Sequence, residues 1–452
     1  MTADPIRWTW AAGLLVAWLG LIALIVVLKR RARRPVETPT ADGWTVVFAS
    51  QTGFAEELAV MTAQTLRQAG KAARLISIAD LDLDDLKQAR HLLWIVSTTG
   101  EGDAPDSAAR FVRRAMATPA ALDGVSYGLL SLGDRSYREY CGFGRALDGW
   151  LRRSGADVLF DPVEVDNGDA GAIRHWQHQL GLLTGSTAQP DWAPAALDRW
   201  TLIERRLLNP GSPGGQAWHL AFQPMDGVPD WQAGDIAEIG LPVAAGQDQT
   251  TIATREYSVA SLPSDGRIEL LVRLMMRPDG TPGLASGWLT QGAAIGDEVA
   301  LRVRANRGFH GPSSDVPLIL IGNGTGLAGL RAHLKARALS PDSGQTWLLF
   351  GERTSAHDAF YDDELMAWRT SGVLTRLDRA FSRDPGDGRY VQHLVTEQAA
   401  EIAAWVERGA VILVCGSLEG MAPGVHAALE AALGTEHLIE LTEAGRYRRD
   451  VY

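Results

Sequence analysis

The sequence predicts an α/β protein of 452 residues, with three successive folded parts behind an apolar N-terminal segment. Apolar runs alternate with helical patterns over residues 43–184 and again over 313–452, which predicts two parallel sheets covered on both faces. Between them, over residues 198–312, short alternating runs are separated by Gly, Pro and Asp turns, which predicts a small antiparallel barrel. A hydrophobic content of 46% and a charged content of 21% are typical of a chain that folds over most of its length.

The N-terminus is the one segment that departs from this pattern. Residues 8–28 carry no charge, and at about 1.5 Å per residue they would span roughly 30 Å, the thickness of a bilayer core. Basic residues follow at once, from Lys29 to Arg34, within a basic and polar linker at 29–42. A cleaved signal peptide is the alternative, but the basic cluster follows the apolar run and no small-residue cleavage site is evident. We therefore expect one transmembrane helix, with the folded parts on the cytoplasmic side.

Charge and cysteine content restrict the partners and the compartment. The formal net charge of -11 argues against nucleic acid and suits docking on a basic patch of a partner protein. The two cysteines, Cys141 and Cys415, fall in different predicted parts, so a disulfide is not expected and a reducing compartment is indicated.

The apolar runs of residues 43–184 predict the strands and helices of the first part. Strands are predicted at 45–49, 92–96 and 127–132, with helices at 56–69 and near 145–153. Residues 185–197, rich in Gly, Ser, Thr and Pro, form the next linker.

The barrel and the last part follow the same reasoning. Barrel strands are expected at 218–222, 267–274 and 298–303, and parallel strands of the last part at 317–321, 346–350, 374–380 and 411–415.

Three polar loops follow strands of the first part, where open parallel sheets bind their ligands. The loop Ser50-Gln51-Thr52-Gly53 leads into a helix, whose N-terminal N–H groups can hold a phosphate. No Gly-Lys-Ser/Thr is present there, which excludes a P-loop nucleotide hydrolase. The loop at 97–103 is glycine-rich, and the loop at 132–140 offers aromatic side chains for stacking.

These three loops resemble the FMN loops of a flavodoxin-like domain. The resemblance implies that Ser50, Gln51, Thr52 and Gly53 hold the phosphate, although Phe54 stands where relatives often have a small residue or Thr. It further implies that the ring is bordered by Thr98, Thr99, Gly100 and Gly133, with Tyr137 stacked on it.

The segment Arg255-Glu256-Tyr257-Ser258 resembles the Arg-x-Tyr-Ser strand of the ferredoxin–NADP reductase family. There the arginine pairs with the FAD diphosphate, which a planar guanidinium suits, and the tyrosine packs on the ring. The segment 283–289 resembles the helix N-terminus over the same diphosphate, and implies FAD contacts from Gly283, Ala285 and Ser286.

A glycine turn, 322–326, follows the first strand of the last part, where backbone N–H groups of Gly324, Thr325 and Gly326 can meet a pyrophosphate. Farther along, the sequence resembles a 2′-phosphate pocket for NADPH, formed by Ser382, Arg383, Tyr390 and Gln392. Relatives often carry a lysine where this chain has Gly388; Arg389 could substitute for it.

The same family places a serine, a cysteine, an acidic residue and a terminal aromatic at the hydride-transfer site. Ser258, Cys415, Asp450 and Tyr452 match these positions, with Tyr452 expected to cover the flavin until nicotinamide displaces it. Read alone, Cys415 would be a small core residue. No metal site is indicated by the spacing of the His and Cys residues.

From about residue 43 onward the chain resembles the diflavin reductases, and within them the flavoprotein subunits of bacterial NADPH sulfite reductases. The implied fold is a flavodoxin-like doubly wound sheet, an antiparallel FAD-binding barrel and a Rossmann-like NADP-binding domain. Only about twenty residues separate Asp235 from Arg255, too few for the helical connecting domain of two-flavin relatives.

The resemblance implies an enzyme that passes electrons from NADPH to FAD, to FMN and then to an acceptor, with the chemistry supplied by the cofactors. A haem or iron–sulfur protein, or a ferric chelate, is the expected acceptor, at a bacterial inner membrane. Two alternatives remain: a sulfite reductase flavoprotein component, and a membrane-tethered interaction protein with vestigial flavin sites.

Overall fold

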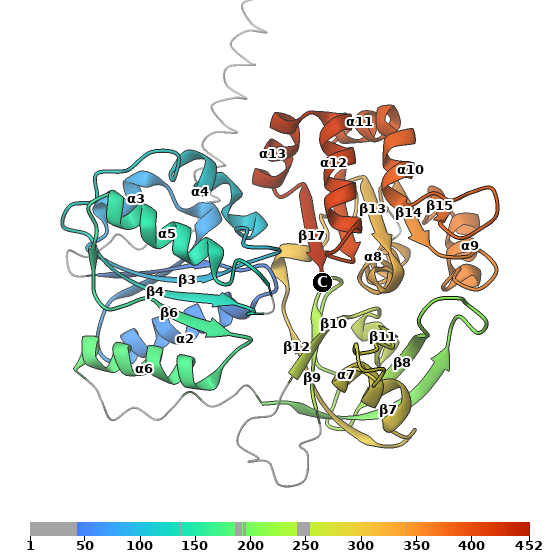
Figure 1. Cartoon of the computed structure of the whole chain (residues 1–452), viewed down its shortest axis with the longest axis horizontal. Helices are drawn as coiled ribbons and strands as arrows, with labels where there is room; N and C mark the ends of the chain where they lie inside the picture. Colours follow the sequence, from blue (N-terminus) through green and yellow to red (C-terminus); the bar gives the residue numbers. More distant parts are fainter. Residues whose placement is uncertain (1–42, 136, 186–191, 193–195, 242–253, 341) are drawn as a thin grey trace, which may run out of the picture.

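The computed structural model describes residues 43–135, 137–185, 192, 196–241, 254–340 and 342–452 (Figure 1). The predicted membrane span 8–28 and the linker 29–42 lie outside these residues, as does most of the linker 185–197. In the part of the chain that is described, no helix is both long and apolar enough to cross a bilayer. The described residues form three sheets in chain order: a six-stranded parallel sheet, a six-stranded antiparallel sheet and a five-stranded parallel sheet. This is the order that the apolar patterns predict.

The first sheet is parallel and has helices on both faces. Its strand order is β2-β1-β3-β4-β5, with β6 also paired to β4. Along β3 the side chains alternate between two cores: Trp94 packs on one face and Ile95 on the other, because successive residues of a strand point to opposite sides. Figure 1 shows α2 and α6 on one face and α3, α4 and α5 on the other. The strands are β1 (Trp44–Ala49), β2 (Ala73–Ser77), β3 (His91–Ser97), β4 (Ser126–Gly133), β5 (Asp157–Val158) and β6 (Val163–Asp166); the helices are α2 (Phe54–Gln68), α3 (Leu83–Gln88), α4 (Ala109–Arg114), α5 (Gly142–Arg153) and α6 (Ala170–Thr184).

Helix α2 begins two residues before the predicted start at residue 56. Gly53 precedes it with φ +91°, a left-handed conformation that glycine adopts without strain, so the chain turns directly from the loop into the helix at Phe54. Strands β2, β5 and β6 and helices α3, α4 and α6 were not predicted individually, because their apolar patterns are short or mixed.

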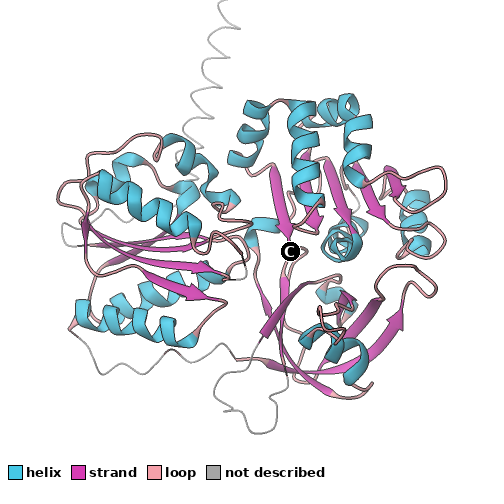
Figure 2. Cartoon of the chain, viewed as in Figure 1, coloured by secondary structure: helices cyan, strands magenta, loops and turns pink. Residues whose placement is uncertain are grey.

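The second sheet is antiparallel, in the order β10-β9-β12-β7-β8-β11, and its two edge strands contact each other. It encloses a core around Trp200, Phe222 and Trp231, and Figure 2 shows that this part is built mainly of strands. The strands are β7 (Asp198–Leu207), β8 (Ala217–Pro224), β9 (Ile236–Gly240), β10 (Thr254–Ser258), β11 (Ile268–Arg273) and β12 (Glu298–Arg304); α7 (Leu284–Gly287) and a π-helical turn (Trp288–Gly292) lie between β11 and β12.

Strands β9 and β10 pair directly, with Gly240 opposite Thr254. Residues 241–253 join them, a stretch with the length of a loop and too short for a folded domain. This is the place where the resemblance puts the connecting domain of two-flavin relatives, so the chain has no room for that domain here.

The third sheet is parallel, in the order β15-β14-β13-β16-β17. One face of this sheet packs on α8 and α9, in a core that contains Phe350. The other face packs on α10 to α13, in a core that contains Trp347. The strands are β13 (Leu318–Asn323), β14 (Thr346–Glu352), β15 (Arg376–Phe381), β16 (Val411–Gly416) and β17 (Tyr447–Val451); the helices are α8 (Leu327–Ala338), α9 (Asp362–Ser371), α10 (Val391–Glu397), α11 (Ala399–Glu407), α12 (Met421–Leu433) and α13 (Thr435–Glu443).

A buried charge network joins the barrel to the last part. Arg331 of α8 donates to the carbonyl of Ala260 at 2.8 Å and pairs with Glu269 of β11 at 2.6 Å. Glu364 of α9 accepts from the same guanidinium at 2.5 and 3.0 Å. Because charges buried this deeply are costly to separate, these two parts form one firmly joined unit.

Candidate active site

The loop Ser50–Gly53 lies between β1 and the N-terminus of α2, as expected of a phosphate loop. The amide of Gly53 donates to the hydroxyl of Ser50 at 2.9 Å, which fixes the turn. Helix α2 has fifteen residues, and no side chain caps the N–H groups of its first turn, which suits them to an anion. The carbonyl of Thr52 accepts from Arg304 of the barrel at 3.1 Å, so this loop lies against the barrel.

The other two predicted FMN loops lie at the same end of the sheet. Thr99 closes its loop by donating to the carbonyls of Asp103 and Ala104 at 3.3 and 3.2 Å, with Gly100 in a left-handed conformation. The hydroxyl of Thr98 is buried and has no hydrogen-bond partner in the described structure. A buried hydroxyl of this kind is costly unless a ligand satisfies it, and FMN, with its polar ring edge, would do so.

The third loop begins at Gly133, where β4 ends. A side chain there would come within 2.9 Å of the Cys141 amide, so only glycine fits. Tyr137 is half-buried, and burial, together with the charges of Asp134, Glu101 and Glu419, raises its pKa. Glu419 belongs to the last part of the chain, so this predicted FMN-stacking ring lies near that part as well.

The predicted FAD residues Arg255 and Tyr257 of β10 differ in exposure. Arg255 is exposed, and the contact that the structure gives its guanidinium is with the carbonyl of Thr254, which leaves donors for a diphosphate. Tyr257 is mostly covered, and burial raises its pKa to about 12, so its ring is neutral at any physiological pH.

The second FAD segment forms a single helical turn. Helix α7 spans only four residues and then becomes a π-helical turn, so the predicted helix N-terminus is shorter than expected. Gly283 precedes it, Ala285 is buried, and the hydroxyl of Ser286 accepts from the Met275 amide at 3.1 Å. The N–H groups of this turn can still face a diphosphate. The hydroxyl of Ser286, expected to contact FAD, instead stabilises the turn through its hydrogen bond with Met275.

Ser258, Cys415 and Asp450 meet in one buried cluster, although they come from β10, β16 and β17. The hydroxyl of Ser258 donates to the Asp450 carboxylate at 2.7 Å, and the Cys415 sulfur lies 3.6 Å from the same oxygen. Burial raises the pKa of Asp450, against the effect of the hydrogen bonds from Ser258 and Cys415. Burial and the nearby Asp450 also raise the pKa of the Cys415 thiol, which therefore stays protonated.

Tyr452 lies next to this cluster at the end of the chain. Its backbone is held by two hydrogen bonds to the loop after β16: its amide donates to Gly416 at 3.0 Å, and its carbonyl accepts from Leu418 at 2.9 Å. The hydroxyl approaches that of Thr325 at 3.5 Å, and the side chain is 52% exposed. The terminal aromatic thus lies between the glycine turn and the Ser258 cluster, where a covering ring is expected.

The glycine turn of the last part is tightly constrained. Gly324 has φ +55°, and a side chain on Gly326 would lie 2.1 Å from the carbonyl of Cys415. The turn Gly324–Gly326 leads directly into α8, so its N–H groups, including that of Thr325, lie at a helix start suited to a pyrophosphate.

The predicted 2′-phosphate pocket lies at the end of β15. Ser382 donates to the carbonyl of Glu352 at 3.3 Å, whereas Arg383 and Tyr390 are exposed and accessible to a ligand. Gln392, on α10, lies against Gly424 of α12. Arg389, the suggested substitute for the missing lysine, pairs with Asp387 at 2.5 Å and Glu397 at 2.9 Å. Its charge is therefore compensated by Asp387 and by Glu397 of α10, which leaves Arg383 as the better phosphate ligand.

Sequence reasoning missed a set of charged residues that join the first part to the other two. Arg302 of β12 pairs with Glu57 of α2 at 2.9 Å, and Arg113 of α4 pairs with Glu443 of α13 at 2.7 Å. Arg449 of β17 pairs with Asp106, and the side chain of Gln51 donates to the Arg449 carbonyl at 2.6 Å. Arginines and carboxylates are common on surfaces, so no sequence signal marks these pairs.

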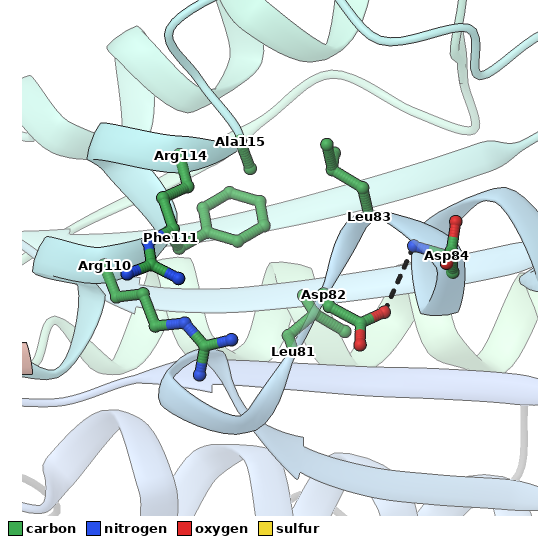
Figure 3. Close-up of a pocket in the computed structure, with 8 residues that line it drawn as sticks. All are labelled: Leu81, Asp82, Leu83, Asp84, Arg110, Phe111, Arg114 and Ala115. Carbon is green, nitrogen blue, oxygen red and sulfur yellow. Dashed lines mark hydrogen bonds between the residues drawn. The ribbon is translucent and has the colours of Figure 1, made fainter. Parts of the chain in front are cut away.

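A pocket of about 280 Å³ opens on the first part, beside α4 (Figure 3). It lies between the start of α3 and α4, and Asp82, which lines it, accepts from the Asp84 amide at 3.1 Å as a helix cap. None of the predicted site residues lines it, so it is not the flavin site.

Comparisons with known proteins agree with this geometry. The flavodoxin family model matches residues 46–176, and the oxidoreductase NAD-binding domain model matches residues 320–427. The sulfite reductase [NADPH] flavoprotein alpha-component of Vibrio cholerae is 28% identical, over 90% of this chain and 87% of its own length. The proteins of the same name from Vibrio vulnificus and Yersinia enterocolitica are 27% and 26% identical, over 92% of this chain in both cases and 88% and 91% of their own lengths.

The alignment with the Vibrio cholerae protein runs over 537 residues, more than the 452 of this chain, so that protein has residues within the aligned span that have no counterpart here. This agrees with the short connection between β9 and β10. The predicted enzyme class is confirmed, and the matched domains agree with FMN, FAD and a nicotinamide dinucleotide as cofactors. The comparisons identify the chain as a flavoprotein reductase that combines a flavodoxin domain with an oxidoreductase NAD-binding domain.

Proposed function

We propose that the chain is a membrane-anchored, NADPH-dependent diflavin reductase that delivers electrons to a haem, iron–sulfur or ferric-chelate acceptor. The observation that carries this proposal is the buried contact of Ser258 and Cys415 with Asp450, beside Tyr452 and the glycine turn. When bound, FAD would accept hydride from NADPH and FMN would pass electrons on singly. The protein's own contribution is to orient these groups, exclude water and hold a proton at Asp450.

Each cofactor has residues that fit it. FMN would be held by Ser50, Gln51, Thr52 and Gly53 at its phosphate and by Thr98, Thr99, Gly100, Gly133 and Tyr137 at its ring. FAD would be held by Arg255, Tyr257 and the turn from Gly283 to Ser286. NADPH would bind along Gly324–Gly326, with Ser382, Arg383, Tyr390 and Gln392 at the adenosine end and Tyr452 yielding to the nicotinamide.

The cluster at Asp450 has a defined electrostatic role. Burial raises the pKa of the Asp450 carboxyl, and its hydrogen bond with Ser258 fixes its orientation. We propose that this pair stabilises the nicotinamide as its charge changes during hydride transfer.

Flavin content tests the proposal directly. The purified full chain should be yellow and release FMN and FAD in about equal amounts on denaturation. A colourless protein that takes up neither flavin would contradict the proposal and favour the alternative of a tethered interaction protein with vestigial sites.

The acceptor needs a separate experiment. The relatives' name suggests a sulfite reductase component as the second candidate, whereas the predicted anchor at residues 8–28 favours an acceptor at a bacterial inner membrane, with the catalytic domains in the cytoplasm. Membrane fractionation followed by co-purification in detergent should recover a haem or iron protein with the chain. Recovery of the chain in the soluble fraction, with a sulfite reductase haem subunit, would support the second candidate instead.

A further inference from the structure

We propose that a cavity between the barrel and α8 is a binding site for a small phenol, whose hydroxyl donates a hydrogen bond to His333. None of the residues assigned above to the flavins or to the dinucleotide lines this cavity. Occupancy of the site is therefore independent of the proposed function, and His333 takes no part in electron transfer.

The cavity has a volume of about 300 Å³. Its inner wall is apolar and buried, with Trp231, Ala233 and Leu262 from the barrel and Leu318 from β13. Exposed residues of the lining, such as Ala336 of α8, form the mouth. An apolar cavity of about 150 Å³ holds benzene, so this one has room for a substituted aromatic ring.

The cavity lies at the contact between two units of the chain, which is a frequent place for ligand sites. Helix α8 lies on the side of its sheet that faces the barrel (Figure 1). Ala233 and Leu262 pack on Ala332 of that helix, and the next residue, His333, lines the cavity. Arg337 follows one turn later and lines it as well. A ligand bound here would contact both units and stabilise them against unfolding.

His333 is the polar group of the inner wall. It is 3% exposed, and its Nε2 has no hydrogen-bond partner in the described structure. The ring of Phe309 packs against the imidazole edge to face, with 5.4 Å between the ring centroids. A polar atom buried in this way is costly to leave unpaired, so a molecule that pairs with Nε2 gains affinity.

The protonation of His333 decides what that molecule must offer. Burial lowers the pKa of His333 to about 3, so the ring is neutral at physiological pH. The charges of His310, Arg448 and Arg337 act in the same direction. A hydrogen bond with the Phe309 backbone opposes them, as a carbonyl that accepts from a ring N–H does. Because Nε2 has no partner, that N–H is on Nδ1, and Nε2 is an acceptor that needs an O–H or N–H donor.

Arg337 decides which kind of donor fits. It is 4% exposed, and its guanidinium donates to the carbonyl of Val316 at 2.7 Å and to that of Ser314. No acidic side chain is among the described residues that line the cavity, so Arg337 gives it a positive potential. That potential disfavours an ammonium group and favours a donor on an electron-rich oxygen. A phenol meets both conditions, and its ring suits the apolar wall around Trp231.

Calorimetric titration of the full chain in detergent tests the site, with FMN, FAD and NADP⁺ in excess so that the cofactor sites are closed to the probe. p-Cresol should bind at one equivalent, about tenfold more tightly than 4-methylanisole, which keeps the ring and the oxygen but has no hydrogen to donate. Benzylamine, a cation at neutral pH, should not bind. The affinity for p-cresol should stay constant from pH 6 to pH 8, because neither partner of the hydrogen bond titrates there.

Substitutions on α8 locate the bound probe. Ala336→Trp should close the mouth and abolish p-cresol binding, whereas Ala338→Trp, at an exposed position that does not line the cavity, should leave it unchanged. His333→Phe keeps a ring of similar size and removes the acceptor, so p-cresol and 4-methylanisole should then bind equally. Both Trp variants change exposed positions, so they test the site even where His333→Phe disturbs folding.

Three results would overturn the assignment: no p-cresol binding with the cofactor sites filled, equal wild-type affinities for p-cresol and 4-methylanisole, or unchanged p-cresol binding in Ala336→Trp. Binding of p-cresol that meets these tests in a chain that takes up no flavin would overturn the proposed function and support the phenol site.

Discussion

At the scale of single residues, the cluster around Asp450 places a carboxyl group where water is excluded. Asp450 is 5% exposed and Cys415 is fully buried, so the charge on Asp450 is stabilised mainly by Ser258. The cost of burying that charge raises the pKa of Asp450 above that of a surface aspartate, against the opposing hydrogen bonds from Ser258 and Cys415.

Replacing Asp450 with Asn should slow flavin reduction by NADPH on the order of 10²-fold, because an amide keeps the shape but cannot take up or release a proton. Stopped-flow measurement of flavin bleaching over a range of pH checks this. The rate in the wild type should change with pH and the rate in Asp450→Asn should not. A pH dependence that survives the substitution would assign the titration to another group.

Arg383 is the residue that should distinguish the two nicotinamide dinucleotides. Arg383→Ala should raise the Michaelis constant for NADPH on the order of 10-fold and leave that for NADH unchanged, since only NADPH carries the 2′-phosphate. Arg389→Ala is the matched control, because Arg389 is already paired with Asp387 and Glu397. Equal effects of Arg383→Ala on both dinucleotides would place the phosphate pocket elsewhere.

At the scale of elements, the turn between β13 and α8 depends on close backbone packing. A side chain on Gly326 would meet the Cys415 carbonyl at 2.1 Å, whereas one on Gly329, a turn farther along, would meet only ordinary contacts at 3.4 Å or more. Gly326→Ala should therefore abolish NADP⁺ binding and lower the melting temperature, and Gly329→Ala should change both little. Calorimetric titration with NADP⁺ measures the difference; similar affinities in the two variants would contradict the packing argument.

The packing of β11 against α8 depends on Glu269. Burial alone would raise the pKa of Glu269, but Arg331, with help from Lys335, outweighs it and lowers that pKa to about 2. A lowered carboxyl pKa stabilises the fold above the unfolded value of about 4.5, and this contribution is lost as the pH falls toward 2.

Glu269→Gln should thus lower the free energy of unfolding at pH 7 by on the order of 3 kcal/mol. Denaturant titration of the two proteins measures this difference. The difference from wild type should shrink at pH 3. Glu298→Gln, in the exposed pair with Arg199, is the control and should have little effect at either pH. A constant difference from pH 7 to pH 3 would show that Glu269 acts through packing and not through its charge.

At the scale of the whole molecule, the two kinds of interface differ in strength. The barrel and the NAD-binding domain share buried charges and apolar contacts, whereas the flavodoxin domain meets them through ion pairs such as Arg302–Glu57 and Arg113–Glu443. These pairs are partly exposed, and their signs alternate between the two sides of the interface. Alternating signs favour one docked orientation over others.

Docking of the flavodoxin domain should therefore weaken with salt. The screening length falls from about 10 Å at 0.1 M salt to about 3 Å at 1 M, so partly exposed pairs lose most of their attraction. Hydrogen exchange should rise in α4 and in the phosphate loop between these conditions and stay low in α8 and β11, which serve as the internal control. An equal rise in all four segments would indicate general destabilisation, and no rise would show that docking is not ionic.

The sequence by itself determined the three sheets, the glycine turns and the phosphate loops, because each depends on neighbouring residues. Continuous apolar runs predicted β3 and β13 to within one or two residues, and the glycine turn at Gly326 and the loop Ser50–Gly53 were evident from short motifs. The grouping of Ser258, Cys415 and Asp450 came only from a family resemblance, since nothing in their spacing brings them together.

Only the tertiary structure decided which charges meet across the domains. Asp106 and Arg449 are 343 residues apart, and neither differs in the sequence from any other surface charge. Their pairing depends on how one folded domain rests on another, a property of shapes that no local pattern encodes. The pairing of Arg389 with Asp387 and Glu397 is of the other kind, because these partners lie only two and eight residues away along the chain.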